Sequence, residues 1–480
     1  MAADPKYEAV IGLEVHAQLV TRTKMFCGCR ADHGLPPNVE VCPVCLGLPG
    51  ALPVVNSEAI RLAAIGGLAL GARVNEESVF ARKNYFYPDL PKGYQISQYE
   101  KPFAVGGQVV FNDGSREIAV PLERLNLEED AGKSLHFGTE DKTGIDFNRC
   151  GIPLLEIVSA PAICELHHAY FYLVRLKQIL EYTGVCAGSM ELGNLRCDAN
   201  VSVRPIGQRE LGTKTELKNL NSFHNVARAL AHELRRQTDI VERGELVKHE
   251  TRLWDAARQV SVEMRSKEEV NDYRYFPEPD LVRIRLARKY LDSLGAALPE
   301  LPHQRETRLS REHELPGYYA GALVSTQRLA DYYEEVAKLT GDPKAASNWI
   351  MTEVLRVLNE KRIDIDSLGL APRDIADLLG MIREGRISGK IAKEVFAEMI
   401  ALGKGASAIV EARGLLQIND EDVIRSSVRQ VIGENPLSVG DFKKGKERAF
   451  RFLVGKVMER TRGMANPTMV HDILKRELET

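Results

Sequence analysis

The sequence has little that would mark it as a membrane, disordered or fibrous protein. It contains no run of roughly 18 apolar residues, and its first residues carry charges where a secretion signal would have an apolar core. Neither sign of charge dominates, since 64 Lys and Arg residues face 67 Asp and Glu residues. We therefore expect a globular cytoplasmic protein, without membrane contact, that meets any anionic partner through a local basic patch.

Cysteine is also scarce, but four of the eight cysteines fall within nineteen positions. Cys27 and Cys29 form one close pair, and Cys42 and Cys45 form a second. Two such pairs can supply the four tetrahedral thiolates that zinc prefers. Because protein ligands would fill all four positions, we predict a structural zinc that staples the loop 27–45. The alternative is four unmetallated cysteines in a loop rich in glycine and proline.

At 480 residues the chain is too long for one hydrophobic core. The first part combines short alternating apolar runs with segments of helical period, which predicts a large α+β domain. Prolines between residues 277 and 302 interrupt this pattern, and almost everything beyond them has a helical period. A second break is expected at Gly403-Lys404-Gly405. We predict a mixed domain (1–294), an all-α helical domain (295–405) and a small α-helical tail domain (406–480).

Several acidic residues lie in segments with the alternating pattern of strands. Glu14 and His16 are two residues apart, so their side chains should project from the same face. Glu156 and Asp198 have apolar neighbours, where an ionised carboxylate is costly unless it meets a cation or hydrogen-bond donors. Further carboxylates of this kind are Glu128, Glu129 and Glu216. Converging carboxylates would suit Mg²⁺ with nucleotide phosphates, whereas scattered ones would form salt bridges.

Two other segments could contact a nucleotide. Residues 131–134 (AGKS) resemble the end of a phosphate-binding P-loop, but the required earlier glycine is replaced by Leu127. A Walker-type ATPase is therefore not expected, although Lys133 remains a candidate phosphate contact. Residues 82–98 gather aromatic, amide and basic side chains, which suits stacking on a nucleotide or sugar. A loop pinned by its own aromatic residues is the alternative.

The last part of the chain has a local excess of positive charge. Residues 441–476 contain ten basic residues and four acidic ones. This excess is typical of electrostatic binding to a phosphate backbone, and a solvated helix face is the alternative. The candidate contacts are Lys443, Lys444, Lys446, Arg448 and Arg451.

Seven short segments together indicate one protein family, although no single segment would do so. They are VIGLEVH (10–16), RKNYFYPD (82–89), EEDAGKS (128–134), NLRCDAN (194–200), ELKNLNS (216–222), DYRYFP (272–277) and ANP (465–467). Together they resemble the GatB family, the B subunits of the bacterial aspartyl/glutamyl-tRNA(Asn/Gln) amidotransferases, nearly from end to end. Leu192 departs from the acidic residue common in the family. The cysteine cluster occurs in only some members, so the zinc prediction depends on spacing alone.

The resemblance implies a cradle-shaped catalytic domain followed by helical domains that hold tRNA. The family's cradle phosphorylates the side-chain carboxylate of misacylated Glu-tRNA(Gln) or Asp-tRNA(Asn) with Mg·ATP, and ammonia then displaces the phosphate. By family position, Glu14, His16 and Glu129 are expected to bind Mg²⁺. Other expected catalytic residues are Glu128, Glu156, Asp198 and Glu216, and the candidate phosphate contacts are Lys83, Lys133 and Lys218.

The resemblance also implies partner proteins. The family's ammonia comes from glutamine hydrolysed by an amidase-fold A subunit, and a small C subunit completes a heterotrimer. No amidase segment is found here, so this component of a carbon–nitrogen ligase (EC 6.3.5.-) is expected to be inactive with glutamine alone. The alternative hypothesis is a non-catalytic tRNA-binding scaffold with a zinc knuckle. The enzyme needs Glu14, His16 and Glu129 around one ion, whereas a scaffold can scatter them.

Overall fold

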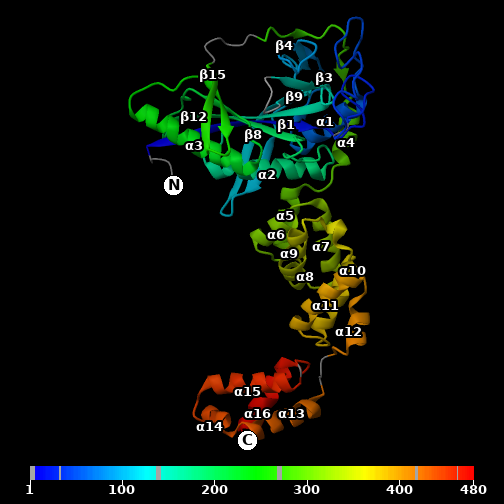
Figure 1. Ribbon diagram of the computed structural model, residues 1–480, viewed down its shortest axis with the longest axis vertical. Coiled ribbons are helices and arrows are strands. Elements are labelled where there is room, and N and C mark those ends of the chain that lie inside the picture. Colours follow the sequence, from blue (N-terminus) through cyan, green and yellow to red (C-terminus); the bar gives the residue numbers. More distant parts are fainter. Residues whose placement is uncertain are drawn as a thin grey trace. The chain divides into compact units, whose positions relative to one another are not determined.

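The computed structural model describes residues 6–31, 34–136, 142–266, 273–416, 420–461 and 463–479 (Figure 1). Asp272, in one of the family segments, and Arg462, in the basic tail, lie outside them. The chain divides into two compact units, Met1–Arg305 and Glu306–Thr480. Within the described ranges, all strands belong to the first unit and the second unit is helical, which confirms the α+β class. Among all the residues that the structure describes, no helix is long and apolar enough to cross a membrane.

A ten-stranded sheet organises the first unit. Its order is β15-β14-β13-β12-β1-β11-β8-β6-β2, with β7 pairing β8, and its only parallel pair among the described strands is β13–β14. The bounds are β1 (Tyr7–Gln18), β2 (Arg73–Val74), β6 (Ala104–Val105), β7 (Gln108–Asn112), β8 (Glu117–Glu129), β11 (Pro153–Ser159), β12 (Leu195–Pro205), β13 (Thr215–Lys218), β14 (Glu250–Asp255) and β15 (Val260–Ser266).

The long strand β1 shows why this sheet has one apolar and one polar face. Its odd-numbered residues Ile11, Leu13 and Val15 are fully or almost fully buried, whereas Glu14 and His16 are half-buried. Helices α1 (Ser57–Ala69), α2 (Leu166–Tyr182) and α3 (Phe223–Glu242) pack into the same core as the apolar face. Each large apolar side chain buried there stabilises the fold by about 1.5–3 kcal/mol. The polar face is left for the acidic residues.

Three smaller sheets are present among the described residues of the first unit. They are β16-β4-β5 (Phe276–Pro277, Ala81–Asn84, Tyr94–Ser97), β9–β10 (Lys133–His136, Thr143–Asp146) and β3–β17 (Glu77–Ser78, Ile284–Arg285). The helix α4 (Arg288–Ala296) follows, and Leu294, Leu298 and Leu301 all pack against the first core. The first core therefore extends beyond the expected boundary at residue 294.

The part of the second unit that the structure describes contains two separate hydrophobic cores. The helices are α5 (Pro302–Glu312, which begins in the first unit), α6 (Gly317–Leu323), α7 (Gln327–Thr340), α8 (Pro343–Trp349), η1 (Ile350–Val354), α9 (Leu355–Lys361), η2 (Ile365–Leu368), α10 (Pro372–Arg383), α11 (Gly389–Leu402), α12 (Ala406–Arg413), α13 (Glu421–Glu434), α14 (Pro436–Lys443), α15 (Glu447–Arg460) and α16 (Pro467–Glu479). Ala406, Ile409 and Val410 of α12 pack with the first of these cores. The segment expected to open the tail thus belongs to the preceding bundle.

Candidate active centre

Cross-strand register assembles a polar cluster on the open face of the sheet. His16 on β1 pairs with Glu156 on β11, and Glu14 pairs with Asp198 on β12. Glu14, His16 and Glu156 each place one ligand atom within 4.8 Å of the others. His16 Nε2 lies 3.6 Å from Glu14 Oε1 and 4.0 Å from Glu156 Oε1. Two oxygen donors and one nitrogen donor in such a group can hold a divalent cation.

Glu128 adds a third carboxylate to this cluster. Its Oε2 lies 3.7 Å from His16 Nε2. The side chain is buried and accepts hydrogen bonds from the Ser97 hydroxyl and from Gln95 Nε2, the latter at 3.3 Å. Burial is the main reason why the pKa of Glu128 is raised, and the Lys83 ammonium opposes the shift. Glu128 thus lies beside the group of Glu14, His16 and Glu156, in contact with His16.

The electrostatics of the cluster are those of crowded carboxylates with the Lys83 and Lys218 ammonium groups nearby. Burial, followed by the charges of Glu128 and Glu14, raises the pKa of Glu156 to about 7. Burial also raises the pKa of Glu14, but the charges of His16 and Lys83 outweigh it and hold that pKa below its ordinary value. A cation bound among these groups would relieve the repulsion, so the carboxylates of the set suit a divalent cation.

Glu129 lies apart from this cluster. Successive residues of β8 point to opposite faces, so Glu128 faces His16 and Glu129 does not. Glu129 is buried, forms an ion pair with Lys92, and accepts the backbone N–H of Ile96 at 3.0 Å. Among the three expected magnesium ligands, the structure therefore brings together Glu14 and His16 only. Glu129 could bind the metal ion only if its ion pair with Lys92 were broken.

Asp198, Glu216 and Lys218 form a neighbouring group on β12 and β13. Lys218 Nζ lies 2.6 Å from Asp198 Oδ2 and 3.0 Å from Glu216 Oε1. Burial lowers the pKa of Lys218, but these two carboxylates outweigh burial and raise it, so the lysine is charged. Thr251 donates a 2.8 Å hydrogen bond to Glu216. Lys218 consequently has two carboxylate partners here and is a phosphate contact only if a phosphate displaces one of them.

Lys83 and Lys133, the other candidate phosphate contacts, lie in different surroundings. Lys83 is on β4, and its pKa is raised because the charges of Glu128 and Glu156 outweigh the effect of burial. Lys133 lines a polar cavity of about 680 Å³ together with Arg149 and Arg196. Lys83 is therefore coupled to the carboxylate cluster, and Lys133 lines a separate polar cavity.

Several residues that hold the cluster were not predicted from the sequence. Asn126 pairs with Glu156 across β8 and β11 and donates a 2.6 Å hydrogen bond to it. Ser97 and Gln95, which hold Glu128, come from the aromatic segment 82–98. Most of that segment is the β4–β5 hairpin, where β4 pairs with β5 in register. The alternation of Asn126 and Glu128 on β8 was the sequence signal that could have identified Asn126.

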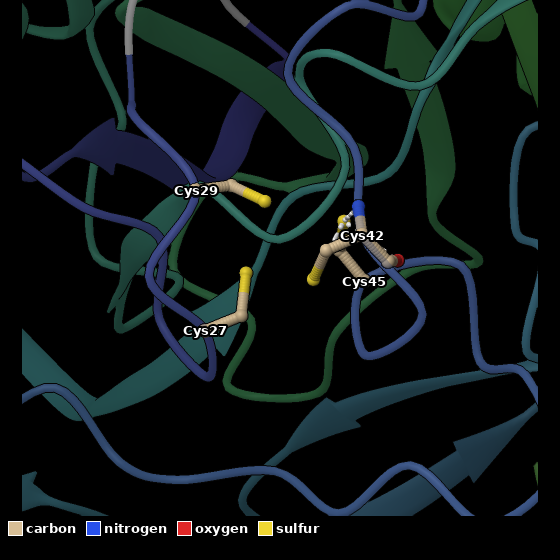
Figure 2. A group of neighbouring side chains, drawn as sticks. All are labelled: Cys27, Cys29, Cys42 and Cys45. Atoms are coloured by element: carbon tan, nitrogen blue, oxygen red, sulfur yellow. Dashed lines mark hydrogen bonds between the residues drawn. The ribbon is translucent and has the colours of Figure 1, made fainter.

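The four clustered cysteines surround a common centre (Figure 2). Their sulfur atoms all lie within 4.8 Å of one another, and none of the four forms a disulfide. Four thiolates bound to zinc at about 2.3 Å would be about 3.8 Å apart, so a small contraction would complete the site. The buried Lys24 ammonium lies 3.8 Å from Cys45 Sγ, and it balances part of the negative charge that four thiolates carry. The donor set fits structural zinc.

The predicted basic contacts of the tail are exposed. Lys443 ends α14, Arg448 and Arg451 lie on α15, and Lys444 and Lys446 lie between these helices. Lys446 is 2.9 Å from Asp441, and Arg451 is 3.9 Å from Glu447. These two ion pairs reduce the charge available to a partner at Lys446 and Arg451.

Comparisons with known proteins cover nearly the whole chain. A model of the GatB/GatE catalytic domain matches residues 9–292, and a GatB domain model matches residues 331–478. The B subunit of the aspartyl/glutamyl-tRNA(Asn/Gln) amidotransferase of Thermodesulfovibrio yellowstonii is 49% identical over 474 residues, which are 98% of either chain. Its counterpart from Chlorobium phaeobacteroides is 51% identical over 473 residues, 98% of this chain and 99% of the relative. The chain therefore belongs to the GatB family.

Proposed function

We propose that the chain converts Glu-tRNA(Gln), Asp-tRNA(Asn) or both into Gln-tRNA(Gln) and Asn-tRNA(Asn), as the B subunit of an amidotransferase. The γ-phosphoryl group of ATP is transferred to a side-chain carboxylate oxygen of the aminoacyl group, and ADP is released. Ammonia then attacks the resulting acyl phosphate and inorganic phosphate leaves. The names of the relatives support the substrate class, and the reaction makes the chain part of a carbon–nitrogen ligase (EC 6.3.5.-).

The observation that carries this proposal is the cluster of Glu14, His16, Glu128 and Glu156 beside Lys83. Mg²⁺ held there would neutralise phosphate charge, which is the main requirement of phosphoryl transfer. Ser97 and Gln95 fix the direction of Glu128. Lys83 supplies a positive charge for a phosphate, and Lys218 and Lys133 are proposed as further phosphate contacts.

Two further parts of the proposal concern partners and zinc. The ammonia is supplied by a separate amidase-fold A subunit, with a small C subunit completing the assembly. The basic residues of α14 and α15 bind the tRNA backbone. The cysteine cluster holds zinc that orders the loop 27–45, because its four sulfur ligands leave no position for a substrate.

The test is ammonia-dependent formation of Gln-tRNA(Gln) by the assembled complex with Mg·ATP. We expect Glu128→Gln to lower kcat at least about 100-fold, because the cluster loses one negative charge. Glu123→Gln is the matched control, since Glu123 is exposed on the same strand. Glu129→Gln, assayed alongside, measures whether the residue paired with Lys92 takes part.

The proposal is wrong if the Glu128→Gln complex consumes ATP and forms product as fast as the Glu123→Gln complex. If the chain were a non-catalytic scaffold that binds tRNA, the two variants would behave alike, because Glu128 would take no part in the consumption of ATP. Product formation with ammonia but not with glutamine in the absence of the A subunit would support the division of labour.

A further inference from the structure

Two tyrosines from distant parts of the chain stack on each other beside the small sheet β16-β4-β5. The rings of Tyr99 and Tyr275 have centroids 4.3 Å apart and are inclined by only 5°. Tyr99 follows the end of β5 by two residues, and Tyr275 immediately precedes β16. Tyr99 is nevertheless 61% exposed. The pair therefore presents an open aromatic surface, which the core of the protein does not use.

A cavity of about 300 Å³ adjoins the stacked pair. This volume is at the lower end of the range of small-molecule sites. Besides the two tyrosines, its lining includes the apolar residues Val79, Ala81, Pro277 and Leu281. Lys101 and Arg283 also line the cavity, but both pair with Glu77, and the acidic Glu100 and Glu278 lie in the same lining. An aromatic surface and an apolar floor together match a planar heterocycle.

The strands that border this cavity also lead to the carboxylate cluster. Ser97 of β5 bonds Glu128, and Tyr99 lies two residues further along. On the neighbouring strand β4, Ala81 lines the cavity and Lys83 is two residues away. Two residues of extended chain span about 6.6 Å.

The ionisation of Tyr275 supports the same proximity. Burial raises the pKa of its phenol to about 12, and the carboxylates of Glu128 and Glu156 contribute to the shift. The cavity and the carboxylate cluster are therefore neighbours.

We propose that this cavity binds an adenosine, with its base stacked on the exposed face of Tyr99 and its phosphate directed towards Lys83. The inference rests on the proposed function, which brings two adenosines to the site: that of ATP and the terminal adenosine of the tRNA acceptor end. Stacking is the favoured recognition mode, because the open tyrosine ring offers a π surface.

The first arm of the test uses the full-length chain, Mg·ATP and inorganic tripolyphosphate. We expect Tyr99→Ala to weaken ATP binding about 5- to 150-fold, the range measured when one stacking aromatic is removed. Tripolyphosphate binding should stay unchanged, and Tyr99→Trp should retain ATP binding. Tyr318→Ala is the matched control, since Tyr318 is 79% exposed in the second unit. Thermal melting of each variant establishes that it is folded.

The second arm compares acceptor minihelices that end in CCA with minihelices that end in CC. If the tRNA supplies the adenosine, the wild-type chain prefers the CCA form, and Tyr99→Ala abolishes that preference while ATP binding is unaffected. The inference is overturned if Tyr99→Ala changes neither ATP binding nor the CCA preference, or weakens tripolyphosphate equally. A wild-type complex that neither binds ATP nor forms product would instead refute the proposed function.

Discussion

The side-chain amide of Asn126 donates a 2.6 Å hydrogen bond to the carboxylate of Glu156 on the adjacent strand. Both side chains are buried. Burial and neighbouring carboxylates already raise the pKa of Glu156 to about 7, and a hydrogen-bond donor favours the ionised form that a cation requires. Asn126 therefore fixes the direction of the Glu156 carboxylate and favours its ionised form.

We expect Asn126→Ala to weaken binding of Mn²⁺, used as a paramagnetic substitute for Mg²⁺, by about 10-fold. The loss follows because Glu156 becomes freer to rotate and harder to ionise. The measurement is free Mn²⁺ by electron paramagnetic resonance during a titration. Asn348→Ala, at an exposed position of α8, should leave the affinity unchanged. Equal affinities in the two variants would show that the cation does not use Glu156.

The contrast between Glu128 and Glu129 shows how far sequence reasoning reaches at this centre. Alternation along β1 predicted that Glu14 and His16 share a face, and the structure places them so. The same rule on β8 separates Glu128 from Glu129, whereas the family resemblance implied that Glu129 binds the metal ion. The position of Glu156 beside His16 was not predictable from the sequence, because the pairing of β1 with β11 joins residues 140 positions apart.

The fold was predictable to a similar degree. Hydrophobic periodicity separated the mixed part from the helical part, since the two have different periods. A helix does end at the predicted break, because α11 ends at Leu402 and Gly403 has a left-handed φ of 64°. What periodicity could not reveal is where α12 packs. Its residues Ile409 and Val410 join the preceding core through tertiary contacts that carry no local signal.

The cysteine cluster should bind one zinc ion per chain. Replacing Cys45 by Ser removes one of four thiolates, so we expect loss of the zinc measured by mass spectrometry and a lower melting temperature of the first unit. Each kcal/mol lost should lower that temperature by roughly 2–4 °C. Cys164→Ser is the control, because Cys164 is exposed and outside the cluster. Full zinc content in Cys45→Ser would contradict the assignment.

Glu233 on α3 should make stability depend on pH. Burial raises the pKa of this carboxyl, but ion pairing with Arg236 and a hydrogen bond from Gln237 outweigh it, so the pKa is lowered. Because the folded pKa is below the unfolded one, the ionised carboxylate stabilises the fold above the unfolded pKa of about 4.5. That contribution is lost as the pH falls through the folded pKa.

We therefore expect Glu233→Gln to lower the free energy of unfolding by about 3 kcal/mol at pH 7. The difference from wild type should shrink steadily below about pH 4.5. Urea unfolding at several pH values measures it. Glu242→Gln at the exposed end of the same helix is the matched control and should change little. A deficit in Glu233→Gln that is independent of pH would mean that packing, and not charge, is responsible.

The tail should bind tRNA through charge. Replacing Lys443, Lys444 and Arg448 by Gln should weaken binding of tRNA most at low salt, and should reduce the slope of log affinity against log salt by roughly one unit per charge removed. Fluorescence anisotropy with labelled tRNA at several salt concentrations measures both quantities.

Two comparisons separate this role from general charge loss or unfolding. The first comparison replaces three exposed lysines by Gln outside the tail: Lys338 on α7, Lys361 on α9 and Lys390 on α11. These replacements remove the same charge and should leave the salt slope unchanged. A chain that ends at residue 416 keeps Ile409 and Val410 in their core, whereas one that ends at residue 405 would remove them. If the longer truncated chain binds tRNA as tightly as the full chain at physiological salt, the tail is not a tRNA-binding domain, because its basic face would then be only a solvated surface.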